Sequence, residues 1–542
     1  MINKKYGVVY TPSRLAEFVA ELLKEEAKET NIQIKTVLDP ACGECALIDA
    51  CKKTLNNNTE YWGIDVDKDV IDKTESISII YNDAILPRNV RQRTAAYWRK
   101  KLPKISAIIA NPPWSSEKIY ERDVLANAGF TFIAGQYDSY VLFLELAYGI
   151  VQDDGLFAFI LPDSIFDAQN ESLRRFLAEK TEIRVIARLG EKIFEEVNRA
   201  ATVLICRKHI PSESFSTKCF RLSTTARKEF LSKQNTLIDL YRSNVHMVLQ
   251  KRFTTNSFCN YDIDTRAYEE SLIDKIQSKS MPWENIFTFG RGVEISKSGR
   301  ICTCAVCGTA QGYKKSQFRD GKKFCASCGT EILINNKSVE NVILKSSKPG
   351  YLPIFVGENI HRYTITGESY IRHNVEGINY KSSELYSPPK LLIRKTGLGI
   401  YAAVDYSSQL TNQTVYILKL RDTCHKVPLE YYLAIINSRV VYYYYLKRYG
   451  ENEWKSHPYL TKKIIFSLPV AEYKDTALDK EIIRLARKLA KTYSYKTDIE
   501  LELLVMKKYG LNDSERKIIS DEMNSLPDLT AVNDMKMEVK YV

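Results

Sequence analysis

Short apolar runs alternate with amphipathic stretches over residues 1–207. Six runs have the length and composition of strands: Thr36–Leu38, Tyr61–Ile64, Ala107–Ala110, Leu156–Leu161, Arg184–Arg188 and Thr202–Cys206. Apolar residues at three- and four-residue spacing predict four helices: Ser13–Glu25, Asp69–Thr74, Ser139–Val151 and Ser172–Glu179. This alternation predicts an α/β domain, with a mostly parallel sheet covered by helices on both faces. Because ligands of such domains bind beyond the carboxyl ends of the strands, functional residues are expected directly after each strand.

The pattern changes after residue 207. Residues 208–275 are polar and mixed, which predicts a connecting segment, and residues 276–475 combine irregular β-like runs with a tyrosine-rich helix, which predicts an α+β domain. Residues 476–542 are predicted to be helical. One apolar stripe in this tail consists of Ile482, Leu485, Ala486, Leu489 and Ala490, and Ile499–Tyr509 forms another. These helices are expected to buttress the preceding domain.

Length and composition limit the class of protein. A chain of 542 residues exceeds what one hydrophobic core supports, so at least two domains are expected. With 44 % apolar and 27 % charged residues, the chain has the composition of a globular protein. No apolar run approaches the roughly 20 residues that span a bilayer, and the first residues lack the apolar core of a secretory signal. The sequence therefore predicts a cytoplasmic protein without a membrane partner.

Positive charge is concentrated in the second part of the chain. Residues 1–200 carry 26 Lys+Arg against 30 Asp+Glu, whereas residues 201–542 carry 52 against 36, which is a net charge of +16. Such an excess is either a solvated lysine-rich surface or a surface that contacts the phosphates of nucleic acid.

Acidic residues follow two of the expected strands, and a third acidic residue is also expected at a strand edge. Asp39 opens the turn Asp39–Glu44, where small residues and Gly43 allow a ligand to approach the backbone closely. Asp65 ends the second strand, where a carboxylate suits the two hydroxyls of a ribose. Asp83 stands where a carboxylate could accept a hydrogen bond from an adenine amino group. Each acid alone could be a turn residue, but the three in this order indicate a nucleoside-containing ligand.

The strand Ala107–Ala110 leads directly into Asn111-Pro112-Pro113-Trp114. Two prolines fix φ and remove two backbone donors, so the loop is rigid and its carbonyls remain available. The amide oxygen of Asn111 and the carbonyl of Pro112 can accept from one NH2 group while Trp114 stacks on the ring that bears it. These two acceptors localise electron density on a weakly nucleophilic aromatic amine, which can then attack a sulfonium methyl group in line.

Four cysteines form two Cys-x2-Cys pairs. Cys304, Cys307, Cys325 and Cys328, with Gly308 and Gly329 after the second cysteine of each pair, predict a tetrahedral zinc site. A structural clip is the default role. Direct DNA contact through the intervening Lys314, Lys315, Lys322 and Lys323 is the alternative. Cys302 breaks the paired spacing, and no metal is assigned to Cys42 and Cys45.

These residues resemble the amino-methyltransferases that act on DNA, in particular the gamma-type, TaqI-like N6-adenine enzymes with a C-terminal specificity domain. The resemblance implies S-adenosylmethionine as the cofactor and a flipped adenine in double-stranded DNA as the substrate. It implies a Rossmann-like methyltransferase mixed sheet, followed by an α+β target recognition domain with a zinc-ribbon-like insertion and a helical C-terminal tail. The domains would be a catalytic domain (1–207), a linker (208–275), a target recognition domain (276–475, zinc knuckles 302–329) and a helical region (476–542).

The resemblance also assigns roles to residues. The cofactor would be bound by residues of the turn and strand-end motifs, namely Tyr10, Thr11, Pro12, Asp39, Pro40, Ala41, Gly43, Asp65, Val66, Asp83, Ala84, Asn111 and Pro112. The catalytic set would be Asn111, Pro112, Pro113 and Trp114, with Phe194 as a second aromatic wall for the target base. In the family a proline usually follows this phenylalanine, whereas here Glu195 does.

Later segments resemble the family's specificity domain: Arg291–Ile295, Lys390–Lys395, Asn412, Ala434–Arg439 and Tyr509–Leu511. Tyr442–Tyr445 are expected to alternate between core and surface, with DNA contact as the less favoured role.

Other activities remain open at this point. An RNA or protein-glutamine N-methyltransferase can use the same Asn-Pro-Pro-aromatic loop, and an N4-cytosine DNA methyltransferase or a silent DNA-binding module is also conceivable. Only about 35 residues precede the first strand, so we expect modification without cleavage. A separate restriction or defence subunit would then be a partner.

Overall fold

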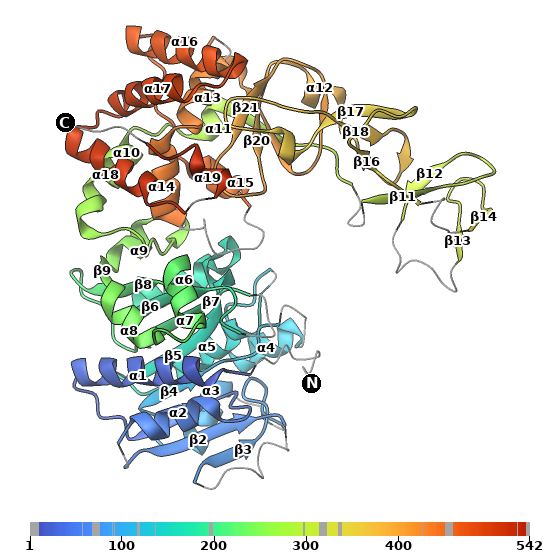
Figure 1. Ribbon diagram of the computed structural model, residues 1–542. Helices are drawn as coiled ribbons and strands as arrows, with labels where there is room; N and C mark the ends of the chain where they lie inside the picture. The colour runs from blue at the N-terminus through green and yellow to red at the C-terminus, as the bar shows by residue number, and fades with distance from the viewer. Residues whose placement is uncertain are drawn as a thin grey trace. The chain divides into compact units, whose positions relative to one another are not determined.

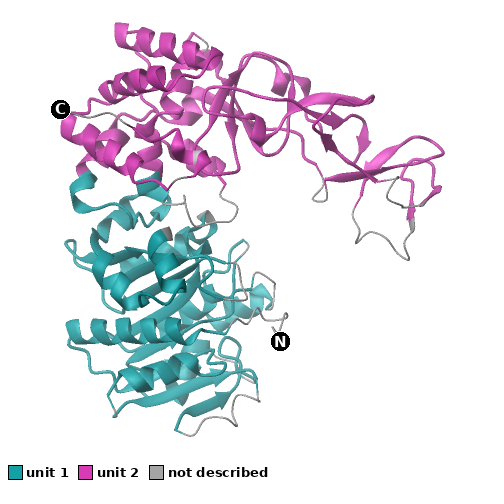
Figure 2. Cartoon of the chain, in the orientation of Figure 1, with its two compact units in different colours: residues 1–270, 446–456 teal, residues 271–445, 457–542 magenta. Residues whose placement is uncertain are grey.

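A computed structural model describes most of the chain (Figure 1). The described residues are 10–56, 58–67, 76–88, 90, 93–115, 120–135, 137–194, 199–295, 299–313, 322–333, 339–424, 426–449, 459–527 and 529–537. They form two compact units (Figure 2): unit 1 comprises Met1–Glu270 and Leu446–Ser456, and unit 2 comprises Ser271–Tyr445 and His457–Val542. The predicted helix Asp69–Thr74 falls outside the described residues.

Unit 1 is built on a nine-stranded sheet of order β3-β2-β1-β4-β5-β7-β6-β8-β9. Its strands are β1 (Thr36–Asp39), β2 (Glu60–Asp65), β3 (Ser78–Tyr81), β4 (Ala107–Ala110), β5 (Leu156–Pro162), β6 (Glu182–Gly190), β7 (Ala201–Arg207), β8 (Ser216–Arg221) and β9 (His246–Leu249). The strands from β3 to β5 are parallel, whereas β7 runs antiparallel to both β5 and β6. The predicted Rossmann-like mixed sheet is therefore confirmed.

Helices cover both faces of this sheet because its central strands are apolar on both sides. In β5, Leu156, Ala158 and Ile160 pack into one core with residues of α1, α2 and α8, and the alternate residues pack into a second core with α5 and α6. The helices of unit 1 are α1 (Ser13–Glu29), α2 (Ala46–Thr54), α3 (Thr94–Lys101), α4 (Arg122–Ala128), α5 (Tyr140–Ile150), α6 (Glu171–Lys180), α7 (Thr224–Leu231), α8 (Leu237–Asn244) and α9 (Lys251–Thr255).

Residues 208–270 differ from the connecting segment that the sequence predicts. They extend the sheet of unit 1 by β8 and β9 and form α7, α8 and α9. Strand β8 mixes the buried Thr217, Cys219 and Phe220 with more exposed polar residues. It also lies near the edge of the sheet, and such strands carry no continuous apolar run. The segment is part of the fold of unit 1.

Unit 2 contains four small sheets, with orders β10-β23-β20-β21, β15-β11-β12-β19, β13-β14 and β16-β18-β17-β22. Their strands are β10 (Phe287–Arg291), β11 (Arg300–Thr303), β12 (Ala310–Gly312), β13 (Lys322–Phe324), β14 (Glu331–Leu333), β15 (Val339–Asn341), β16 (Ile343–Leu344), β17 (Tyr351–Phe355), β18 (Ser369–Arg372), β19 (Val375–Glu376), β20 (Lys390–Arg394), β21 (Ala402–Asp405), β22 (Leu410–Thr411) and β23 (Val415–Leu420). This unit is α+β, as the sequence predicts.

The helices of unit 2 gather mainly after the strands. They are α10 (Glu270–Ser278), α11 (Trp283–Ile286), α12 (Ser383–Tyr386), α13 (Leu429–Ile436), α14 (Arg439–Tyr449), α15 (Lys462–Ser467), α16 (Ala477–Lys491), α17 (Tyr495–Lys508), α18 (Asp513–Asn524) and α19 (Thr530–Asn533), of which α10 and α14 continue into unit 1. The buried Ile482, Leu485, Ala486 and Leu489 line α16, which packs against α13 and α17. The tail helices thus buttress the domain, as expected.

The four tyrosines Tyr442–Tyr445 do not alternate between core and surface, because all four side chains are buried.

None of the helices in the described residues is both long and apolar enough to cross a membrane.

Candidate active site and metal centre

The candidate site lies at the carboxyl edge of the parallel strands of unit 1. Strand β1 pairs with β2 on one side and β4 on the other, so the chain after each of these strands emerges at the same edge. Asp39 ends β1, Asp65 ends β2, and Asn111 directly follows β4. Residues that are 26 to 72 positions apart in the sequence therefore meet at one edge of the sheet.

The turn after β1 is tied to the end of β2. The Asp65 carboxylate accepts hydrogen bonds from the backbone N–H of Gly43 (2.8 Å) and of Asp67 (2.9 Å), one on each oxygen. Gly43 has a φ of +48°, and a Cβ there would meet no atom within 4 Å, so the turn leaves open space beside it. Each carboxylate oxygen has a second lone pair, so Asp65 can still accept from a ligand hydroxyl.

Burial dominates the electrostatics of Asp39. Its side chain is 1 % exposed, and Oδ1 accepts a hydrogen bond from the Ala41 N–H at 3.0 Å. Burial raises the pKa of Asp39 to about 8, the Ala41 N–H opposes this rise, and the negative charge of Asp65 adds to it. Without a cationic partner, Asp39 is therefore mostly protonated at neutral pH.

Asp83 caps the loop that follows β3. Its Oδ1 accepts from the backbone N–H groups of Ile85 (2.8 Å) and Leu86 (3.0 Å), and its Oδ2 accepts from the Tyr120 hydroxyl (2.8 Å). The carboxylate is thus fixed in orientation, with remaining lone-pair capacity on Oδ2. Tyr120 was not predicted from the sequence, since no motif connects it to Asp83.

The loop after β4 is held from two sides. The Asn111 Nδ2 donates to Thr11 Oγ1 at 3.0 Å, which ties the predicted Thr-Pro segment to the loop across 100 positions of sequence. The Ser139 hydroxyl donates to the Pro113 carbonyl, and Ser139 exchanges two further hydrogen bonds with the backbone of Ser115. Among the residues that the structure describes, no hydrogen bond reaches the Pro112 carbonyl. The loop is therefore rigid, with the Pro112 carbonyl available as an acceptor.

Two aromatic rings lie beside this loop. Trp114 and Phe194 are both 3 % exposed and contact each other edge to face, with ring centroids 5.3 Å apart and an interplanar angle of 87°. Arg199 donates from Nη1 to the Trp114 carbonyl at 2.7 Å. A base stacked on the Trp114 ring would meet Phe194 at its edge rather than as a parallel wall, because the two rings are perpendicular.

The other predicted cofactor residues differ in exposure. Tyr10 is 50 % and Val66 45 % exposed, so both side chains are accessible to a ligand. Ala84 is buried in the core beside Trp98, whose Nε1 donates to the Ala84 carbonyl at 2.8 Å. Pro12 precedes α1 and its carbonyl accepts the first N–H groups of that helix.

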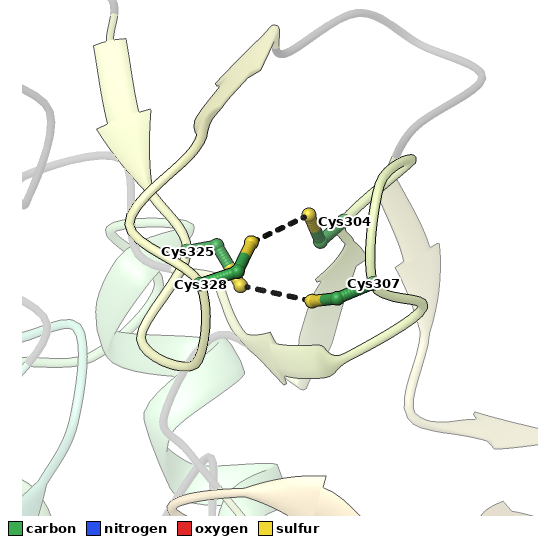
Figure 3. A group of neighbouring side chains, drawn as sticks. All are labelled: Cys304, Cys307, Cys325 and Cys328. Carbon is green, nitrogen blue, oxygen red and sulfur yellow. Dashed lines mark hydrogen bonds between the residues drawn. The ribbon is translucent and has the colours of Figure 1, made fainter.

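The four predicted metal ligands lie together in unit 2 (Figure 3). Their sulfur atoms are all within 4.8 Å of one another, with 3.7 Å between Cys304 and Cys328 and 3.5 Å between Cys307 and Cys325. A tetrahedral zinc ion with Zn–S bonds of about 2.3 Å holds its sulfurs about 3.8 Å apart. The cluster thus fits a zinc ion, and Cys302 lies outside it.

Both knuckles have the same local structure. In each, the first cysteine exchanges backbone hydrogen bonds with the glycine and threonine that follow the second cysteine. The second cysteines, Cys307 and Cys328, contact Thr309 and Thr330 at 3.2 and 3.3 Å. The Thr309 hydroxyl and backbone lower the pKa of Cys307 to about 6, and Thr330 likewise lowers the pKa of Cys328. The repeated Cys-x2-Cys-Gly-Thr sequence explains the shared geometry and favours metal-binding thiolates.

Comparison with known proteins agrees with this organisation. The family model described as "N-6 DNA Methylase" matches residues 2–270, and the model described as "TaqI-like C-terminal specificity domain" matches residues 352–470. The chain is similar to the type II methyltransferase M.BanIII of Aneurinibacillus aneurinilyticus (30 % identity over 35 % of this chain). It is also similar to the type I restriction enzyme MjaVII methylase subunit of Methanocaldococcus jannaschii (27 % over 39 %). These matches cover 37 % and 38 % of the two relatives' own lengths.

A solved structure to which part of this chain is similar is the methyltransferase subunit of a type I restriction-modification system from Streptococcus thermophilus. It matches 46 % of this chain and 57 % of its own, with 14 % identity and a TM-score of 0.36. The two family models match in the order that the sequence motifs predict, one on each part of the chain. The chain therefore carries an N-6 DNA methylase domain over residues 2–270 and a TaqI-like C-terminal specificity domain over residues 352–470.

Proposed function

We propose that this protein is a site-specific DNA methyltransferase that transfers a methyl group from S-adenosylmethionine to the N6 amine of a flipped adenine in duplex DNA. The observation that carries this proposal is the rigid Asn111–Trp114 loop, which lies at the same sheet edge as the carboxylates Asp39 and Asp65. It would act as the modification component of a restriction-modification or phage-defence system, alone or with a separate restriction subunit.

The residues at the sheet edge fit the cofactor. The open space beside Gly43 can take a ligand against the backbone, and Asp65 and Asp83 keep lone pairs for a ribose and an adenine amino group. The exposed Val66 offers an apolar surface for the adenine ring. Bound S-adenosylmethionine supplies an electrophilic methyl group on a positively charged sulfur.

The chain's own residues would prepare the amine. The Asn111 amide oxygen and the Pro112 carbonyl accept its two N–H groups, which shifts electron density onto the nitrogen and away from the aromatic ring. Trp114 stacks on the base, and Arg199 and Ser139 hold the loop in place. Because positioning and hydrogen bonding suffice, the reaction needs no covalent nucleophile on the protein.

Unit 2 has a surface suited to DNA where β10, β20 and β23 lie side by side. The Lys395 Nζ lies 5.9 Å from the Tyr416 ring centroid and 5.8 Å from that of Tyr459, which is 45 % exposed. Burial and the neighbouring Arg291 charge lower the pKa of Lys395. Tyr416 is buried, so Lys395 and the exposed Tyr459 are the cation and the aromatic ring that this surface offers, a combination found on nucleic-acid surfaces, and this part of unit 2 is proposed to contact the target.

The four-cysteine cluster is proposed to hold a structural zinc ion. Two thiol pairs from separate hairpins would be joined by the metal, and all four positions are filled by sulfur, which leaves no open coordination position for catalysis.

Methyl transfer to different polymers tests the proposed substrate. We expect tritium from labelled S-adenosylmethionine to appear in duplex DNA, and not in RNA or protein offered in parallel. Labelling of RNA alone, or of protein alone, would instead indicate one of the other substrates of an Asn-Pro-Pro-aromatic loop.

Cofactor affinity should rise with pH. Asp39 is mostly protonated below about pH 8, and only its ionised form attracts the cationic cofactor. The Kd for the cofactor should therefore fall by up to about tenfold for each pH unit and level off near pH 8. The free energy of unfolding should change in the opposite sense. The raised pKa of Asp39 destabilises the fold as pH increases through the same range, so greater stability cannot explain tighter binding.

Calorimetry across this pH range, with two variants, checks the assignment. Asp39→Asn should bind the cofactor with a flat pH profile, whereas Asp49→Asn, an exposed position on α2, should keep the wild-type profile. An unchanged slope in Asp39→Asn would show that another group titrates.

A further inference from the structure

The hydrogen bonds of the Asp83 carboxylate leave it one way to bind a ligand. A carboxylate accepts at about four lone-pair positions, shared equally between its two oxygens. On Asp83, Oδ1 accepts from the N–H groups of Ile85 (2.8 Å) and Leu86 (3.0 Å), so both of its positions are filled. Oδ2 accepts from the Tyr120 hydroxyl at 2.8 Å. Among the described residues no other group bonds to Oδ2, so a ligand donor is accepted at its second position.

The backbone on both sides of Asp83 is held without help from Tyr120. The Asp83 N–H donates to Asn82 Oδ1 at 2.9 Å, and the Ala84 carbonyl accepts from Trp98 Nε1 at 2.8 Å. These bonds fix where the side chain begins, and the two N–H groups on Oδ1 hold one end of the carboxylate. The Tyr120 hydroxyl is the contact that sets the direction of Oδ2.

Tyr120 comes from a separate part of the chain. It lies 37 positions after Asp83, in the connection between β4 and α5. Its ring is partly buried and packs against the core cluster that also contains Ala84 and Ile85. Because packing holds the ring, the hydroxyl is a fixed donor rather than one that must be ordered when a ligand binds.

We infer that Tyr120 is a specificity-determining residue, which positions Asp83 so that the cofactor site selects a nucleoside with a 6-aminopurine base. This inference rests on the proposed function, in which Asp83 accepts from the adenine amine of S-adenosylmethionine. An outer partner that orients an acceptor in advance lowers the cost of binding its donor. Tyr120 acts through Asp83 and is a positioning residue.

Calorimetry with two ligands tests this role on the full-length protein. One ligand is S-adenosylhomocysteine, the demethylated product of the cofactor, and the other is its 6-deamino analogue, with purine in place of adenine. The wild type should bind the first about 10- to 100-fold more tightly, the range for a hydrogen bond to a charged group. Tyr120→Phe removes only the hydroxyl. It should bind S-adenosylhomocysteine about fivefold more weakly, as expected for one net hydrogen bond, and the analogue as tightly as the wild type does.

Tyr97→Phe is the matched control. Tyr97 lies on α3 and is another partly buried tyrosine that packs against the same core, so its variant should keep the wild-type affinity for both ligands. Equal weakening of both ligands in Tyr120→Phe would mean that the hydroxyl serves only the fold. That result, unchanged affinities in Tyr120→Phe, or a wild type that does not distinguish the two ligands would each overturn the inference.

A double variant shows whether Tyr120 acts through Asp83. Asp83→Asn keeps an oxygen for the N–H groups of Ile85 and Leu86 but removes the second acceptor, so the preference for the amine should disappear. Adding Tyr120→Phe should then leave the ratio of the two affinities unchanged. A further fall in that ratio would mean that Tyr120 contacts the ligand itself, which contradicts a positioning role.

Methyl transfer to duplex DNA by the wild type is measured separately. Intact transfer without the expected selectivity would reject the role of Tyr120 and leave the proposed function standing. A wild type that neither binds S-adenosylhomocysteine nor transfers a methyl group would reject both.

Discussion

Replacing Asn111 by alanine is expected to reduce methyl transfer by roughly 100- to 1,000-fold, the effect of losing one preorganised hydrogen-bonding group in an active site. Asn111 provides one of two acceptors for the target amine, and its Nδ2 also fixes the loop to Thr11. The loss should appear in kcat, because the acceptor acts mainly when the amine becomes nucleophilic. The Kd for S-adenosylmethionine should change little, since the three carboxylates remain.

Single-turnover transfer and calorimetry of Asn111→Ala separate these two quantities. Asn244→Ala, an exposed asparagine at the end of α8, serves as the matched control and should behave as the wild type. A parallel loss of cofactor affinity and transfer in Asn111→Ala would mean that the loop binds the cofactor rather than the amine.

Replacing Cys325 by serine is expected to eliminate zinc binding and to unfold the two cysteine-bearing hairpins, β11–β12 and β13–β14, which together are called the zinc module. Structural zinc contributes apparent binding free energies of about 10 kcal/mol or more in small zinc domains, which is more than a module of this size gains from its apolar interior. Among the described residues, the apolar cluster around the cysteines consists of four buried side chains, Cys302, Cys304, Cys325 and Ile332. DNA affinity should fall with the metal, whereas S-adenosylmethionine binding by unit 1 should persist.

Metal analysis of the purified protein and protease digestion would detect this change. Cys302→Ser is a matched control, because Cys302 is buried in the same module but contacts the Gln311 carbonyl at 3.8 Å instead of the other thiols. Full zinc content in Cys325→Ser, or loss of zinc in Cys302→Ser alone, would contradict the assigned ligands.

The central strands of unit 1 were predictable because they are apolar on both faces. Strands β1, β2, β4, β5, β6 and β7 match their predicted ranges to within two residues at each end. Strands β3, β8 and β9 were not predicted, because they lie at or next to the edges of the sheet and their sequences mix polar with apolar residues. The burial of the four tyrosines of α14 could not be predicted either, because tyrosine occurs both in protein cores and at protein surfaces.

The sequence indicates the residues of the candidate site, but it does not indicate the hydrogen bonds between them. Spacing after strands indicates Asp39, Asp65 and Asn111 because parallel strands end at one edge. No sequence rule reveals that the Asp65 carboxylate binds the Gly43 N–H, that Tyr120 contacts Asp83, or that Ser139 holds the Pro113 carbonyl. These contacts join residues far apart in sequence, and each depends on how the completed fold places the two groups. The cysteine cluster was the exception, because its ligands follow a repeated local motif.

The central claim is that the transferred methyl group arrives on the N6 amine of adenine in duplex DNA. Mass spectrometry of nucleosides, combined with sequencing that detects modified bases in DNA from a host expressing the gene, identifies base, site and strand together. The account predicts N6-methyladenine at one recurring sequence, absent from a host that expresses Asn111→Ala. N4-methylcytosine at the recurring site, or unmodified DNA alongside methylated RNA or protein, would contradict it.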